Sequence, residues 1–193
     1  MSYNYIKLKI NPTHFDIMKD ELMDLRHQWD NTCVYIEKDI DYMKLASVRM
    51  YLEQLGIVGY ITNISHIVIK AGEKLPVHVD ELHRFQWSLT LPFRNIEGTY
   101  NRFYKSDKPL ERMVDTNDYG PWAVGSCLGY SDMEGVYLID EVEVDGPILI
   151  DTRKPHDVVN RTTHDREAIG VRLNTKFDPE MLLPYYLDDL PLL

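Results

Sequence analysis

Two side chains that can bind a metal lie two residues apart in the segment LPVHVD, residues 75–80. Side chains at i and i+2 of a strand point to the same face, so His78 and Asp80 can bind one ion together. A second histidine, His156, follows a turn, an apolar run and another turn, which would put it at the start of a strand. Two histidines and one carboxylate leave coordination positions open for other ligands. These residue types therefore predict a divalent-metal site.

Arg166 comes ten residues after His156 and would add a positive charge to this site. A guanidinium is planar and makes two parallel hydrogen bonds to a carboxylate, so it can clamp an organic anion. Arg172 lies on the same face of the predicted strand and is the alternative clamp. A 2-His-1-carboxylate set with open positions is the pattern that non-haem iron(II) oxygenases use. The four residues together predict an iron centre that binds an anionic small molecule.

The elements that must position these residues follow a helical start and a strand-rich remainder. Apolar residues at 3-4 spacing predict helices over 15–29 and 45–55, with Thr13 capping the first and Gly56 ending the second. Beyond residue 60, short runs rich in Ile, Val, Tyr and Thr alternate with turn-forming residues. They predict strands at 64–70, 75–79, 85–93, 99–104, 135–144, 147–151, 156–160 and 166–173. Such short, regularly spaced strands indicate an antiparallel sandwich or barrel.

Two of the predicted strands have one bulky apolar face and one small or polar face. The polar faces hold Gln86, Ser88, Thr90 and Pro92 in 85–93, and Arg166, Ala168, Gly170 and Arg172 in 166–173. Because side chains alternate across a strand, the polar faces point either to solvent or into a cavity, with helices covering the apolar faces. Polarity alone leaves both arrangements open, and the metal-ligand motif favours the cavity. Small residues beside Arg166 would leave room there for a ligand.

The pattern LPVHVD…FQWSLTLPF…GPILIDTRKPHDVVNRTTHDREAIGVRL resembles Fe(II)/2-oxoglutarate-dependent oxygenases. It is most similar to the aspartyl/asparaginyl β-hydroxylase-like and prolyl-hydroxylase-like branches, including compact microbial and phage-encoded forms. The resemblance implies a mainly β fold with flanking α, namely a double-stranded β-helix (jelly roll, cupin-like) with N-terminal helices. We expect a single domain over 1–193, with its helical part at 13–56 and its jelly-roll core at 60–175.

Carried over position by position, the resemblance implies that His78, Asp80 and His156 ligate Fe(II). 2-Oxoglutarate would take two of the open positions and O2 the third, with ascorbate as a reductant. Arg166 matches the family's basic residue for the distal carboxylate of 2-oxoglutarate, and Ser88 would add a hydroxyl hydrogen bond to that carboxylate. The implied activity is hydroxylation of a C–H bond. The groups that orient the metal ligands cannot be identified from the sequence.

Composition limits the setting and the partners. A net charge of −10 argues against nucleic-acid or membrane binding, which needs clustered Lys and Arg. Two cysteines, Cys33 and Cys127, are too few for a disulfide framework. The first ten residues lack the layout of a signal peptide, and the longest uncharged run, 55–69, is too short to span a bilayer. We therefore expect a reducing, cytoplasmic setting, which would keep ferrous iron available.

Two other classes of function fit the same barrel. One is a cupin-like module that holds a metal or small ligand without oxidation, and the other is a non-oxidative metalloenzyme such as a hydrolase or isomerase. Neither requires Arg166 at its spacing from His156. The prime substrate is expected to be a peptide, a protein, a free amino acid or a small metabolite, selected by segments 80–84 and 106–130. The apolar tail 181–187 docks either on the core or on another subunit.

Overall fold

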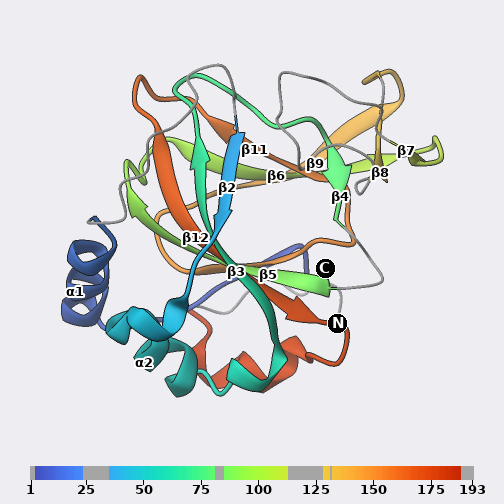
Figure 1. Ribbon diagram of the computed structural model, residues 1–193. Coiled ribbons are helices and arrows are strands. Elements are labelled where there is room, and N and C mark those ends of the chain that lie inside the picture. The colour runs from blue at the N-terminus through green and yellow to red at the C-terminus, as the bar shows by residue number, and fades with distance from the viewer. Residues whose placement is uncertain (1–2, 24–34, 81–84, 113–127, 131, 188–193) are drawn as a thin grey trace.

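The strands form two antiparallel sheets that face each other (Figure 1). The computed structural model describes residues 3–23, 35–80, 85–112, 128–130 and 132–187. The first sheet, called the major sheet below, has the order β1 (Tyr5–Lys7), β10 (Ile148–Asp151), β5 (Phe85–Arg94), β12 (Arg166–Asn174), β3 (Ile61–Ile69) and β2 (Tyr35–Asp39). The second, called the minor sheet, has the order β7 (Glu111–Arg112), β8 (Leu128–Gly129), β4 (His78–Val79), β11 (His156–Asn160), β6 (Thr99–Ser106) and β9 (Val136–Glu143).

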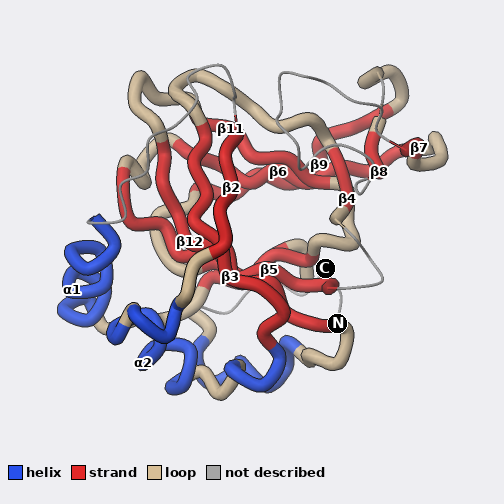
Figure 2. Tube along the Cα trace, viewed as in Figure 1, coloured by secondary structure: helices blue, strands red, loops and turns tan. Residues whose placement is uncertain are grey.

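Helices lie along the outer side of the major sheet (Figure 2). They are α1 (Pro12–Met23), α2 (Ala46–Gln54) and 3-10 helices at Tyr42–Lys44, Val58–Tyr60 and Pro179–Tyr185. Their apolar side chains and the outer faces of β5 and β12 form one core, which includes Met18, Leu22, Val48, Leu52, Trp87, Leu89, Leu91, Phe93, Ile169, Val171 and Leu173. The helices therefore cover the apolar strand faces, as the cavity alternative predicts.

The polar faces of β5 and β12 point between the two sheets. Directly paired residues of antiparallel strands share a face. In the register of these two strands, Gly170 lies opposite Thr90, and Arg172 lies opposite Ser88. The inner face of the major sheet is thus polar at its centre, while its outer face is apolar and closed by helices. The polar inner face of the major sheet therefore faces the minor sheet, where the predicted metal ligands lie.

The structure has helices and strands where they were predicted within its described residues, and it adds four strands that were not predicted: β1, β2, β7 and β8. Of these, β2 lies within the segment 13–56 that was expected to be helical, so that segment is only partly helical. One predicted helix cap is also wrong. The first helix begins at Pro12 rather than after Thr13, because the side-chain oxygen of Asn11 accepts a hydrogen bond from the backbone N–H of His14 at 3.2 Å. Proline suits the first helical position because it has no N–H to leave unpaired. Gly56 follows the second helix with φ +70°, the left-handed conformation that ends a helix, as predicted. Residues 24–29 of the first predicted helix lie outside the described residues.

The C-terminal described segment packs on the core of the same chain. Leu182 is fully buried in that core, and Tyr186 forms a β-bridge with Leu8. This is one of the two placements expected for the tail 181–187. Among the described residues, no helix is both long and apolar enough to cross a membrane.

Candidate functional site

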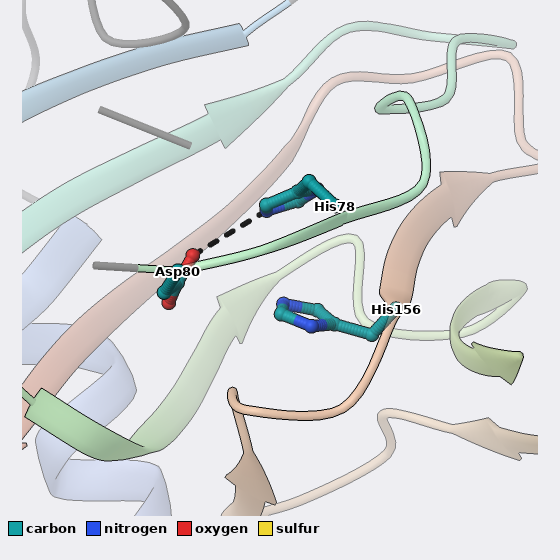
Figure 3. A group of neighbouring side chains, drawn as sticks. All are labelled: His78, Asp80 and His156. Carbon is teal, nitrogen blue, oxygen red and sulfur yellow. Dashed lines mark ion pairs between the residues drawn. The ribbon is translucent and has the colours of Figure 1, made fainter. Parts of the chain in front are cut away.

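The structure brings His78, Asp80 and His156 together, with potential ligand atoms all within 4.8 Å of one another (Figure 3). His78 and His156 face each other across the register of β4 and β11, and their ring centroids are 4.6 Å apart. Asp80 follows β4, and its backbone N–H donates to the carbonyl of Thr152 at 3.1 Å. His78 Nε2 lies 3.5 Å from Asp80 Oδ1. The pairing of β4 with β11 and the backbone hydrogen bond of Asp80 to Thr152 therefore hold the three side chains close together.

Each histidine is oriented by a backbone carbonyl two residues earlier, just before its strand begins. Nδ1 of His78 lies 2.8 Å from the carbonyl oxygen of Pro76, and Nδ1 of His156 lies 2.9 Å from that of Lys154. A carbonyl only accepts, so each Nδ1 carries the proton and donates it. On binding a metal, each ring would present the lone pair of Nε2, because Nδ1 is already held by the carbonyl. These two carbonyls are the orienting partners that the sequence did not identify.

The charge states of the cluster suit a cation. Burial raises the pKa of the Asp80 carboxyl, but the hydrogen bond from His78 and the positive charges of His156, His78 and Arg172 outweigh it and lower the pKa to about 2. Burial, followed by the charge of His78, lowers the pKa of His156. At neutral pH, Asp80 is ionised and His156 is neutral. Both are in the protonation state that metal binding requires.

A cavity between the sheets extends from this cluster toward Arg166. Its polar lining, besides the three ligand candidates, consists of Ser88, Thr90, Asn101, Arg166 and Arg172. Its apolar lining includes Ile67, Ile69, Leu75, Ile150 and Val158. A cavity with apolar walls and a few convergent polar groups is the usual form of a small-molecule site. All the site residues predicted from the sequence therefore line one cavity.

The two arginines lie at different levels of this cavity. Arg166 is 3% exposed and pairs with Ile69, which packs against Leu75 and Val158 away from the metal ligands. Arg172 is six residues further along β12 and close enough to Asp80 for its charge to lower that carboxyl's pKa. Arg166 therefore lies at the far end of the cavity, and Arg172 lies at the end that holds the metal ligands.

The hydroxyl groups of β5 also lie at different levels of the cavity. Ser88 lies opposite Arg172, whereas Thr90 lies two residues nearer to Arg166 along the strand. Gly170 lies opposite Thr90, and a Cβ there would press on Cδ1 of Ile67, so a larger residue would displace that side chain. The small residue thus keeps Ile67 of β3 in position at the cavity wall, in addition to leaving space beside Arg166.

Two cavity residues, Thr90 and Asn101, were not singled out by the sequence analysis. Thr90 is on the polar face recognised for 85–93. Its position two residues after Ser88, on the same face of the strand, was the signal that could have identified it. Asn101 belongs to a predicted strand, but nothing in its local sequence separates it from a surface asparagine. Of the segments expected to select the substrate, 81–84 and 113–127 lie outside the described residues, as do Cys33 and Cys127.

Comparison with known proteins finds similarity at the level of structure. No protein-family model matches the sequence, and no curated protein matches it. A Pseudomonas putida prolyl-4-hydroxylase is 12% identical, with a TM-score of 0.54 over 90% of this chain and 93% of that chain. A Trichoplax adhaerens prolyl hydroxylase, solved with a hypoxia inducible factor peptide fragment, is 12% identical, with a TM-score of 0.51 over 92% of this chain and 84% of that chain.

A third similar structure is the epimerase SnoN in complex with Fe3+, alpha ketoglutarate and nogalamycin RO. It is 11% identical, with a TM-score of 0.57 over 97% of this chain and 84% of that chain. At such identities the comparisons concern the fold alone. They confirm the predicted double-stranded β-helix with flanking helices, which these oxygenases share with the present chain.

Proposed function

We propose that this chain is a single-domain Fe(II)- and 2-oxoglutarate-dependent dioxygenase that hydroxylates a C–H bond. The observation that carries the proposal is the cavity that joins His78, Asp80 and His156 to Arg166. A metal-binding end and a buried cation at the opposite end match a ligand with a chelating group and a second carboxylate. 2-Oxoglutarate has this chemistry. The shared fold with iron and 2-oxoglutarate proteins supports the proposal.

In this proposal His78, Asp80 and His156 hold Fe(II), and the two histidines bind through Nε2. The iron would couple oxidative decarboxylation of 2-oxoglutarate to oxidation of the prime substrate. Arg166 binds the distal carboxylate through paired hydrogen bonds. A hydroxyl of β5 adds a further one: Ser88 is the residue expected from the sequence, and Thr90 lies two residues nearer to Arg166. The apolar walls around Val158 and Ile69 keep water away and strengthen these charge interactions. A reducing, cytoplasmic setting with ascorbate would keep the iron ferrous.

The prime substrate is proposed to be an amino-acid side chain, in a peptide, a protein or the free amino acid, or a small metabolite. The resemblance to β-hydroxylases and prolyl hydroxylases supports the first group, and one similar structure is a complex with a peptide fragment. Another is a complex with nogalamycin RO, a small molecule. The net charge of −10 makes nucleic acid an unfavourable partner. The same cavity also fits a cupin-like module or a non-oxidative metalloenzyme, and a binding test separates these.

The experiment measures 2-oxoglutarate binding to the Mn(II)-loaded protein by calorimetry, and then succinate formation with Fe(II), ascorbate and O2. We expect binding that requires the metal, and slow succinate formation even without a prime substrate. Arg166→Met should weaken 2-oxoglutarate binding by about 10–100-fold, because a hydrogen bond to a charged group contributes roughly 1.5–3 kcal/mol. Arg161→Met is the control, since Arg161 pairs with Glu141 at the surface.

Absence of 2-oxoglutarate binding to the metal-loaded protein would exclude the oxygenase and leave the binding module or the non-oxidative enzyme. Once a substrate is found in a screen of amino acids and peptides, incorporation of labelled oxygen tests hydroxylation directly. This matters because the similar structures include an epimerase and a carbocyclase, both alpha ketoglutarate dependent.

A further inference from the structure

Two buried asparagines on neighbouring strands of the minor sheet have opposite hydrogen-bonding states. Asn160 on β11 is fully buried, and its side-chain nitrogen donates to the carbonyls of Ile69, Lys70 and His164 at 2.8–3.1 Å. Asn101 on β6 is 1% exposed, yet its side-chain nitrogen has no hydrogen-bond partner among the described residues. Buried polar groups in proteins are nearly always paired, so an unpaired donor calls for an explanation.

Asn101 lines the same cavity as the metal-ligand candidates. In the register of β6 and β11 it pairs with Val158, so both side chains point to the inner face. Val158 is two residues beyond His156, a step of about 7 Å along the strand. Val158 also packs against Ile69, the register partner of Arg166. Asn101 therefore lies beyond the metal ligands, on the side of the cavity toward Arg166.

The chemistry of the group limits what it binds. A carboxamide nitrogen only donates hydrogen bonds, so its missing partner is an acceptor. 2-Oxoglutarate has four carbon–carbon bonds of about 1.5 Å each, so with its keto-acid end at the metal its other carboxylate reaches approximately the level of Asn101. We propose that Asn101 donates a hydrogen bond to the distal carboxylate of 2-oxoglutarate, opposite Arg166. This inference rests on the proposed function.

Arg166 and Asn101 would then approach one carboxylate from two different sheets. Arg166 is on β12 of the major sheet, and Asn101 is on β6 of the minor sheet. A carboxylate has acceptor positions on two oxygens, so a bidentate guanidinium leaves lone pairs for a further donor. The asparagine adds selectivity for a dicarboxylate without adding charge.

The test compares Asn101→Ala with the wild-type protein, both loaded with Mn(II). The dissociation constants of 2-oxoglutarate and of 2-oxopentanoate, which has the same chain length but no distal carboxylate, are measured by calorimetry and by competition. We expect the Kd of 2-oxoglutarate to rise about 10-fold or more, while that of 2-oxopentanoate changes less than about twofold. Asn101→Asp retains the side-chain shape but introduces an anion, and should weaken 2-oxoglutarate binding further.

Thermal unfolding of the metal-free protein separates a binding role from a structural one. Because the nitrogen of Asn101 has no partner to lose among the described residues, Asn101→Ala should leave the Tm unchanged or raise it. Asn160→Ala, which removes three hydrogen bonds to carbonyls, should lower the Tm and provides the matched comparison.

The outcomes distinguish this inference from the proposed function. If the wild-type protein with metal does not bind 2-oxoglutarate, both fail together. If the wild type binds and both Asn101 variants bind equally well, only the role of Asn101 is overturned. Equal weakening of the two ligands by Asn101→Ala would assign the residue to the keto-acid end and also overturn the inference.

Discussion

The two sheets of the jelly roll differ in what they bury. The outer face of the major sheet is closed by helices over one continuous apolar core. The minor sheet contributes to a small apolar cluster around Phe103, and its outer face carries polar networks. One of them is formed by Arg102 and Tyr104 with the buried carboxylate of Asp157. Its edge strand β9 also exposes three consecutive apolar residues, from Tyr137 to Ile139.

This difference assigns stability mainly to the major sheet and metal binding mainly to the minor sheet. Apolar area removed from water is greatest under the helices, so the major sheet carries most of the folding free energy. The three ligand candidates belong to the minor sheet or lie next to it: His78 is in β4, Asp80 directly follows β4, and His156 is in β11. The major sheet contributes Arg166 and the hydroxyl groups of β5 to the cavity. Changes in the two sheets should therefore affect different measurements.

The largest effect is expected for the double change His78→Ala and Asp80→Ala. Loss of residues that merely orient a metal ligand typically costs 10–100-fold in affinity, and removal of two ligands should exceed about 100-fold. Metal affinity is measured by calorimetry with Mn(II). The double change also removes the hydrogen bond of His78 to the Pro76 carbonyl and the charge of Asp80 near Arg172, so circular dichroism first checks that the metal-free variant is folded. His164→Ala, a change at an exposed loop histidine, is the control. Retained metal affinity in the double variant would show that other residues bind the ion.

The second prediction concerns the core of the major sheet. Leu89 is fully buried on the outer face of β5, beneath the helices. Leu89→Ala should reduce the free energy of unfolding by about 2–5 kcal/mol, through lost apolar burial and a residual cavity. Leu138→Ala on β9 of the minor sheet is the matched control, since Leu138 is 51% exposed and its loss should change stability by less than about 0.5 kcal/mol. Denaturant titration measures both.

Equal effects of the two leucine changes would break the distinction between the sheets. The folded Leu89→Ala protein should still bind Mn(II) with wild-type affinity, because the leucine lies on the face away from the cavity. A loss of metal affinity there would mean that the core also positions the ligands.

The sequence predicted those features of the site that depend on local patterns. Alternation along a strand put Arg166 and Arg172 on one face, and the i, i+2 spacing put His78 and Asp80 on another, because these relations need only one strand. The choice between solvent and cavity for the polar faces was left open by alternation. It depended on where the helices pack, which is a tertiary property.

The features that escaped prediction all depend on contacts between distant segments or on the backbone path. The role of Asn101 follows from its register against β11, over fifty residues away in sequence. The carbonyls that orient the two histidines depend on the local backbone path around Pro76 and Lys154, which residue type does not reveal. The predicted strand 75–79 is shorter in the structure, β4 being only His78–Val79; a proline at 76 has no N–H for the ladder.

The smallest predicted effect concerns Glu167, which follows Arg166 in sequence but points to the opposite face of β12. Its carboxylate accepts hydrogen bonds from His66 Nε2 at 2.9 Å and from Arg94 at 2.5 Å. Burial raises the pKa of Glu167, but these hydrogen bonds and charges outweigh it and lower the pKa below the usual 4.5. The residue therefore contributes to the structure of the sheet, on the face of β12 away from the cavity.

Glu167→Gln should reduce the free energy of unfolding by about 1–3 kcal/mol at pH 7, measured by denaturant titration. Because the folded pKa is depressed, the wild-type advantage is fully present above about pH 4.5 and is lost as pH falls through the folded pKa. The stability curves of wild type and variant should thus converge in acid. Glu53→Gln, at an exposed pair with Arg49, should show no such pH-dependent difference. If the difference in free energy of unfolding between wild type and Glu167→Gln does not change with pH, the effect comes from packing and not from charge. If the variant changes the Kd of 2-oxoglutarate, the two faces of β12 are coupled.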